Sequence, residues 1–185
     1  MSTTGTPDDL GAVTRTSQII VAALIMCVIL FLAVVLMVIR PMAGGVNGLP
    51  PNLITYIALA VAAANLALSF SIPGMVAANG RRRIAREIPA KTTDADRPAR
   101  LVDASSDTPR LAILYQTQLI VGAAFLEGAA LFNGIAYILE RPPIALAAVV
   151  VLLGLLASRM PTRDRVDSWI DAQSVALQED RQGLP

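Results

Sequence analysis

The sequence predicts an all-α, polytopic membrane protein with four transmembrane helices and a short amphipathic helix near the C-terminus. Two observations support this prediction. Of the 185 residues, 55% are hydrophobic, and the mean hydropathy is +0.60, whereas soluble domains are usually about 45–50% apolar. The apolar residues also form long unbroken blocks, at 19–39, 53–78, 111–139 and 144–158. A soluble helix or strand would instead alternate them with polar residues.

The first block, residues 19–39, contains no charged residue, and Cys27 is its only mildly polar residue. About 20 such residues in a helix cross a hydrocarbon core roughly 30 Å thick. The block is longer than the apolar part of a cleaved signal peptide, which is about 7–15 residues. Arg40 also follows it directly. We therefore expect an uncleaved signal anchor that remains as the first span.

The fourth block, residues 144–158, is the shortest. Pro142 and Pro143 precede it and Arg159 follows it. Proline is favoured in the first turn of a helix, and an arginine at the end of a span can extend its side chain to the headgroups. A buried helix of a soluble protein is the alternative for so short a run. We favour a fourth span, because it returns the chain to the side on which the third block begins.

The distribution of Lys and Arg predicts the orientation. Thirteen of the 15 lie in the two tails and in the connection 79–110: Arg15, Arg81, Arg82, Arg83, Arg86, Lys91, Arg97, Arg100, Arg110, Arg159, Arg163, Arg165 and Arg181. The other two connections contain only Arg40 and Arg141. Because Lys and Arg concentrate on the cytoplasmic side, we expect a bacterial inner-membrane protein with both termini cytoplasmic. Its parts are then a tail at 1–17, a membrane domain at 18–160 and a second tail at 161–185.

The connection 79–110 begins with a basic run, Arg81, Arg82, Arg83 and Arg86. Directly after a span, such a run sets the topology and attracts anionic lipid headgroups. A nucleic-acid patch is the alternative, but no aromatic residues lie nearby to stack on bases. We therefore expect these arginines to contact lipid headgroups and expect no nucleic-acid partner. The rest of the connection mixes charges with Thr, Ser, Asp and Pro, which predicts a flexible cytoplasmic loop.

The tail 161–185 contains apolar residues at helical spacing, Val166, Trp169, Ile170 and Leu177, with charged residues between them. This pattern predicts a short amphipathic helix lying at the membrane interface. Trp169 would be its anchor, because tryptophan is enriched at that level. Packing of the same face against the cytoplasmic side of a partner protein is the alternative.

Glu127 is the only charged residue in the third block. It lies eight residues beyond Leu119, or about 12 Å below the cytoplasmic boundary at about 1.5 Å per residue. Ionised carboxylates are costly in hydrocarbon, and such residues usually face the bundle interior. The pairs Ala124/Gly128 and Ala130/Gly134 have the spacing of small residues that lets another helix approach. We therefore expect Glu127 to face a neighbouring helix.

The second block offers polar partners for Glu127. They are Asn65, Ser69 and Ser71. Pro73 has no N–H, so it leaves the carbonyl of Ser69 without its helical donor. Since Ser69 and Glu127 lie at similar depth, we expect Glu127 to be a neutral acid that bonds to the second helix near Ser69.

The stretch 109–139 resembles the carboxylate-bearing helix of the rotary ATP synthase proteolipid, subunit c, at Pro109, Ile120, Val121, Phe125 and Glu127. The resemblance implies that Glu127 carries protons. The chain departs from that family in the residues before the proline and in the second block, which is not glycine-rich. As a whole the chain resembles four-span bacterial inner-membrane proteins, and that resemblance implies no activity.

Catalytic chemistry has little support in the sequence. There is no histidine, and the single cysteine, Cys27, cannot form an internal disulfide. No glycine-rich phosphate-binding loop or nucleophile with a partner base is recognisable. We expect no enzyme activity, no metal and no cofactor, but a structural, assembly or accessory role in the membrane, with a second copy or another membrane protein as partner. The alternative is proton or ion translocation with Glu127 as the carrier.

The orientation gives a testable prediction. Cysteines introduced singly at Ser105 and Asn47, in a Cys27→Ser background, should react with a membrane-impermeant thiol reagent from opposite sides. In intact cells only the cysteine at position 47 should label, because Lys and Arg retain the 79–110 connection in the cytoplasm. Labelling of position 105 with protection of position 47 would show the reverse orientation.

Overall fold

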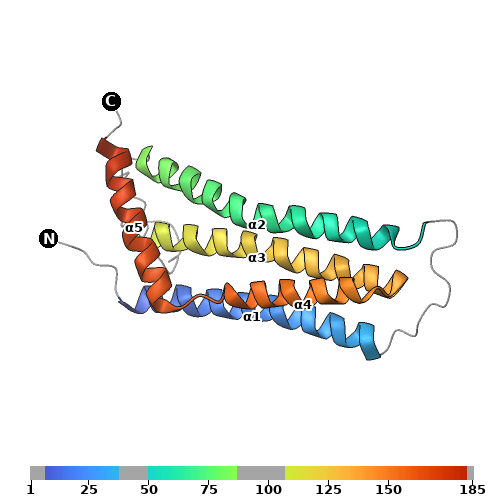
Figure 1. Cartoon of the computed structure of the whole chain (residues 1–185). Coiled ribbons are helices and arrows are strands. Elements are labelled where there is room, and N and C mark those ends of the chain that lie inside the picture. The colour runs from blue at the N-terminus through green and yellow to red at the C-terminus, as the bar shows by residue number, and fades with distance from the viewer. Residues whose placement is uncertain (1–6, 38–49, 87–106, 183–185) are drawn as a thin grey trace, which may run out of the picture. The chain divides into compact units, whose positions relative to one another are not determined.

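The computed structural model describes residues 7–37, 50–86 and 107–182, and within these ranges every regular element is an α-helix (Figure 1). The helices are α1 (Pro7–Met37), α2 (Leu53–Arg86), α3 (Asp107–Glu140), α4 (Pro143–Ser158) and α5 (Arg163–Gln182). The all-α prediction is confirmed.

Three of these helices are long and apolar enough to cross a membrane. They are α1 from Gly11 onward, α2 and α3. The α4 helix has only 16 residues and is joined to α5 at a bend of 69°. The pair would supply a fourth crossing if it is one bent span. Length and composition therefore give a protein with three such helices, or four if the bent pair is counted.

The helices extend further than the apolar blocks. The tail 1–17 contains the start of α1, and the connection 79–110 is helical at 79–86 and 107–110. Most of the part that was expected to be flexible, residues 87–106, lies outside the described ranges. The helices are longer than the blocks because extending an existing helix costs far less than starting one. Arginine and alanine, which dominate 81–86, are also good helix formers.

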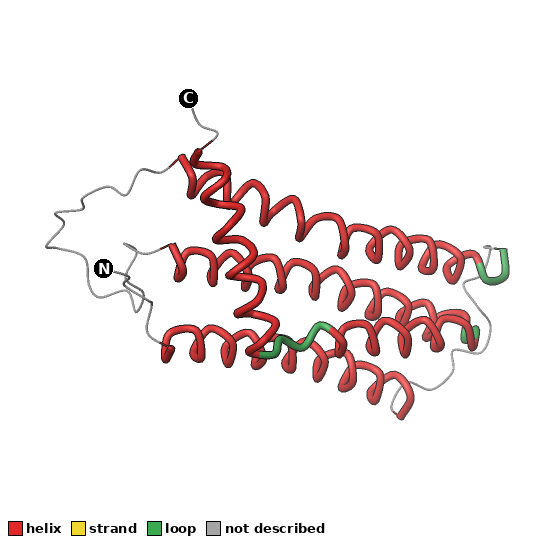
Figure 2. The backbone as a smooth tube through the Cα atoms, turned by 60° about the vertical axis from the view of Figure 1, so that its left-hand side comes forward, coloured by secondary structure: helices red, strands yellow, loops and turns green. Residues whose placement is uncertain are grey.

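The short loops on either side of α4 have local causes. Pro142 is extended, with φ −72° and ψ 131°, and Pro143 occupies the first turn of α4, where a missing N–H costs nothing. Arg141, with φ 57°, ends α3 in the left-handed conformation that commonly closes a helix. Figure 2 shows these loops in green between α3 and α4 and between α4 and α5.

The described chain forms two compact units, and α1, α2 and α3 contribute to both. Unit 1 comprises 1–18, 73–119 and 161–185, and unit 2 comprises 19–72 and 120–160. Unit 2 therefore contains most of the apolar blocks and α4. Unit 1 contains α5 and the polar extensions of the three long helices.

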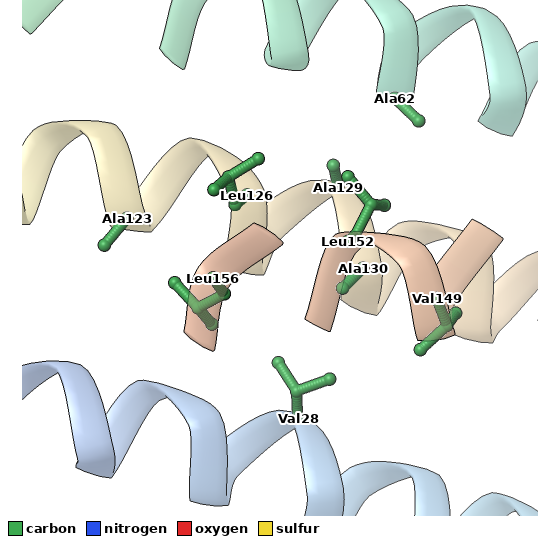
Figure 3. Close-up of a cluster of buried hydrophobic side chains, with 9 residues drawn as sticks. All are labelled: Val28, Ala62, Ala123, Leu126, Ala129, Ala130, Val149, Leu152 and Leu156. Atoms are coloured by element: carbon green, nitrogen blue, oxygen red, sulfur yellow. The ribbon is translucent and has the colours of Figure 1, made fainter. Parts of the chain in front are cut away.

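The core of unit 2 is made by side chains from four helices. Its buried members are Val28, Ala62, Ala123, Leu126, Ala129, Ala130, Val149, Leu152 and Leu156. In Figure 3, leucines and valines of α1, α3 and α4 lie opposite alanines of α2 and α3. Alternating large and small residues allows close packing between helices in a membrane, where the hydrophobic effect does not hold them together.

Gly134 confirms the expected close approach of another helix to α3. A Cβ atom at this position would clash with the ring of Phe31 on α1, and Ala130, one turn earlier, is also buried. The pair Ala124/Gly128 behaves differently. Ala124 is exposed, and a Cβ atom at Gly128 would meet no other group. Within unit 2 only one of the two small-residue pairs therefore lies against a helix.

Unit 1 is organised around α5. Val166, Ile170 and Leu177 are buried, and the Trp169 ring packs edge-on against Tyr115 of α3, 5.3 Å between centroids. The amphipathic helix is thus present, but its apolar face lies against the protein's own helices. These buried side chains are therefore not available to the membrane as expected, and the place of Trp169 at the membrane interface stays a prediction.

Two ion pairs fix the far end of α5. Arg81 of α2 donates from Nε to Asp180 at 2.7 Å and from Nη1 to Gln173 at 3.0 Å. Arg181 donates to both carboxylate oxygens of Asp107, at 2.7 and 2.9 Å. A bidentate pair of this kind specifies orientation as well as proximity.

The close approach at Gly134 gives a prediction. Gly134→Ala should lower the free energy of unfolding by about 1–3 kcal/mol, because the added methyl group displaces Phe31 in a packed interface. Gly128→Ala is the matched control on the same helix. It should leave stability unchanged or raise it by up to about 1 kcal/mol through helix propensity. Reversible unfolding of the purified protein in mixed micelles measures both. Equal losses in the two variants would contradict the assigned α1–α3 contact.

Candidate functional site

Glu127 is half-buried on α3, and its neighbour is on α1 and not on α2. The side chain of Cys27 on α1 lies close to the Glu127 carboxyl group. The sequence analysis did not pair these two helices through polar groups. The neighbour that the structure indicates for Glu127 is therefore on α1, whereas the sequence analysis expected a partner on α2.

Ser69 has a different partner from the one predicted. It is fully buried on α2, and its hydroxyl donates to the carbonyl of Leu66 at 2.8 Å. The carbonyl that Pro73 leaves without a helical donor accepts a hydrogen bond from Nη2 of Arg159 at 3.0 Å, and the same nitrogen lies 3.4 Å from the Ser69 hydroxyl oxygen. The predicted bond from Glu127 to this carbonyl is thus replaced by a bond from Arg159.

Arg159 is held in place by a second contact. Its guanidinium carbon lies 4.9 Å from the centroid of the Phe70 ring, at the distance of a cation–π interaction. The sequence indicated only that Arg159 ends the fourth block. The structure shows that it also binds the backbone of α2, because α4 brings it beside the residue four positions before Pro73.

The other two predicted partners of Glu127 do not contact it. Asn65 is half-buried and Ser71 is exposed on α2. Among the described residues we find no hydrogen bond from either side chain to the Glu127 carboxyl group. The four residues expected to form one polar cluster therefore lie in different surroundings.

Asn133 is a buried polar residue that the sequence analysis did not single out. Its Nδ2 donates to the carbonyl of Ala58 on α2 at 3.2 Å and to that of Ala129 on its own helix at 2.9 Å. Its Oδ1 is buried without a hydrogen-bond partner. The signal in the sequence was an asparagine inside an apolar block, six residues after Glu127. Asparagines in such positions bridge helices.

Glu140 makes the most extensive polar contact in unit 2. Its carboxylate accepts hydrogen bonds from Ile54 N at 3.1 Å, from Thr55 N at 2.9 Å and from the Thr55 hydroxyl at 2.7 Å. These N–H groups belong to the first turn of α2, where they have no partner within the helix. A negative charge there is also stabilised by the helix dipole. Glu140 therefore caps α2 from the end of α3.

The predicted lipid-contacting arginines fall into two groups. Arg81 is half-buried and bonded to α5, so it is not free to contact headgroups as expected. Arg82, Arg83 and Arg86 line a surface depression of about 350 Å³ beside Asn79. Trp169 packs on Tyr115. Only the second group of arginines remains a candidate for headgroup contact.

These contacts suit helix packing better than catalysis. In the described ranges no group of three or more His, Cys, Asp or Glu residues could hold a metal ion. The charged groups Glu140 and Arg159 each bind backbone atoms of α2. Glu127 is instead close to a side chain, that of Cys27 on α1.

Comparisons of the chain with protein-family models, with curated proteins and with solved structures find no match.

Proposed function

We propose that this chain is a four-span inner-membrane protein, with both tails cytoplasmic, that has a structural, assembly or accessory role. The observation that supports this most is the use of polar groups in unit 2. Glu140, Asn133 and Arg159 each bond to the backbone of α2. Polar groups that are used to join helices are not available to bind or transform a substrate.

The proposal takes α4 as a span of its own. Its 16 residues rise about 24 Å at about 1.5 Å per residue, somewhat less than the roughly 30 Å of a hydrocarbon core. Flanking side chains such as Arg159 can bridge that difference. The α5 helix is a poor continuation of the span, because it carries charges along its length, including Asp164, Asp171 and Asp180.

Proton translocation through Glu127 is the second candidate, and one feature of α3 favours it. Ala124 and Gly128, beside Glu127 in sequence, are exposed. A helix of another protein could approach the carboxyl group along this face, as the resemblance to the ATP synthase proteolipid implies. The thiol of Cys27 would then compete with that helix for the carboxyl group.

The experiment that separates the two candidates is Glu127→Gln. The amide retains the shape of the side chain and its ability to accept a hydrogen bond from Cys27, but it cannot take up and release a proton. In the structural role, membrane insertion, abundance and co-purifying proteins should stay near wild type. Purified protein in liposomes should conduct no more protons than empty vesicles under an imposed potential. Glu179→Gln, an exposed position on α5, is the matched control.

Two outcomes would contradict the structural role. One is loss of the cellular phenotype in Glu127→Gln cells while the protein remains folded and abundant and Glu179→Gln cells are unaffected. The other is proton flux through wild-type vesicles that disappears in Glu127→Gln vesicles. Either result would favour the proton carrier, because only titration of the acid distinguishes the variant from the wild type.

A further inference from the structure

Unit 1 contains an open groove of about 620 Å³ that the sequence analysis did not anticipate. It lies between the start of α1 and the start of α5. Among the described residues its lining includes Gly11, Thr14, Arg15, Gln18 and Arg163. It shares no lining residue with the depression beside Asn79.

The groove lies where the apolar sequence of α1 begins. Gln18 lines it, and the first apolar block starts at the next residue, Ile19. The Gln18 side chain donates through Nε2 to the carbonyl of Pro161 at 2.9 Å. Pro161 comes three residues after the end of α4 at Ser158. In a membrane, the groove would therefore be at the level of the lipid headgroups.

The chemistry of the groove suits an anion. Two arginines, Arg15 and Arg163, line it. Arg163 is the first residue of α5, where a positive charge is unfavourable for the helix itself because of its dipole. Its guanidinium lies against the backbone of α1, since a Cβ atom at Gly11 would be 2.9 Å from Nη2. The guanidinium therefore lies in the groove at the N-terminus of α5, whose free N–H groups also favour an anion.

We propose that this groove binds the phosphodiester group of an anionic phospholipid, through Arg15 and Arg163. The planar guanidinium group matches the geometry of phosphate oxygens. A lipid is favoured over free phosphate because the groove adjoins the first apolar residue of a span, so that the acyl chains of a lipid bound there would enter the hydrocarbon. The inference rests on the membrane placement proposed above but not on the role of Glu127.

The test is a binding titration of the full chain, purified in a non-ionic detergent. The probes are short-chain phosphatidylglycerol, short-chain phosphatidylcholine and inorganic phosphate. Phosphatidylglycerol should bind saturably to wild type, and phosphatidylcholine and phosphate should bind at least about tenfold more weakly. Arg15→Gln with Arg163→Gln should weaken phosphatidylglycerol binding by about tenfold or more, because hydrogen bonds to a charged partner are lost.

The matched control is Arg110→Gln with Arg165→Gln. It removes the same charge from α3 and α5, outside the lining of the groove and of the depression beside Asn79, and should change binding by less than about twofold. Circular dichroism checks that both double variants are folded. If the double variant does not fold, Arg15→Gln alone, at an exposed position, replaces it. This single variant should also weaken phosphatidylglycerol binding, but by less.

Three outcomes would overturn the proposal. Equal weakening in the control variant would mean that only net charge matters. Equal affinity for inorganic phosphate would mean that the ligand is a free anion, and unchanged binding in the groove variants would place the lipid elsewhere. Glu127→Gln should bind phosphatidylglycerol like wild type. The binding titration therefore tests the lipid site alone. The proton-flux and labelling experiments test the proposed function separately.

Discussion

The arrangement of unit 2 depends on one constraint: a backbone polar group that has no partner in its own helix and is buried away from water must find one elsewhere in the protein. The α2 helix leaves such groups at two places, at the N–H groups of its first turn and at the carbonyl of Ser69, four residues before Pro73. Glu140 binds the first and Arg159 binds the second. Arg159 directly follows α4 in the sequence, and Glu140 ends α3, separated from α4 by Arg141 and Pro142. Thr55 and Ser69 are 14 residues apart, or about 21 Å along a helix, and α4 itself rises about 24 Å. Because the two lengths are similar, Glu140 before α4 and Arg159 after it can each reach one of the two places on α2.

Between these two points, packing requires few polar groups. Ala62 of α2 and three alanines of α3 lie opposite larger residues of α1 and α4, and Gly134 leaves room for Phe31. Asn133 adds a third bond to α2, at the carbonyl of Ala58. The glutamate that stands out most in the sequence, Glu127, takes no part in holding α2. It lies beside Cys27 of α1, which is why its function can be tested separately from the stability of the bundle.

The helices could be predicted from the sequence because long apolar blocks have few alternatives to a helix. Their ends could not, since residues such as Arg81 to Arg86 are compatible with both a loop and a continued helix. The freed carbonyl of Ser69 was predictable from Pro73, but its partner was not. Pro73 identifies the acceptor, whereas the choice between Glu127 and Arg159 depends on how α4 lies against α2. Glu140 was missed for a similar reason: its partners are mainly backbone N–H groups, which no residue type marks. The apolar face of α5 was assigned to the membrane interface because an amphipathic pattern looks the same whether that face meets lipid or the protein's own helices.

The most direct test of this account is a double-mutant cycle between Arg159 and Pro73. Arg159→Gln should lower the free energy of unfolding in mixed micelles by about 1–2 kcal/mol, because the carbonyl of Ser69 loses its donor. In a Pro73→Ala background the restored N–H can bond to that carbonyl, and the same substitution should cost about 1 kcal/mol less. The remaining cost should match the contact with Phe70, measured with Phe70→Leu in the same background. If the effects of Arg159→Gln and Pro73→Ala are additive, Arg159 does not satisfy the carbonyl that Pro73 frees, and the two-point attachment of α2 is contradicted.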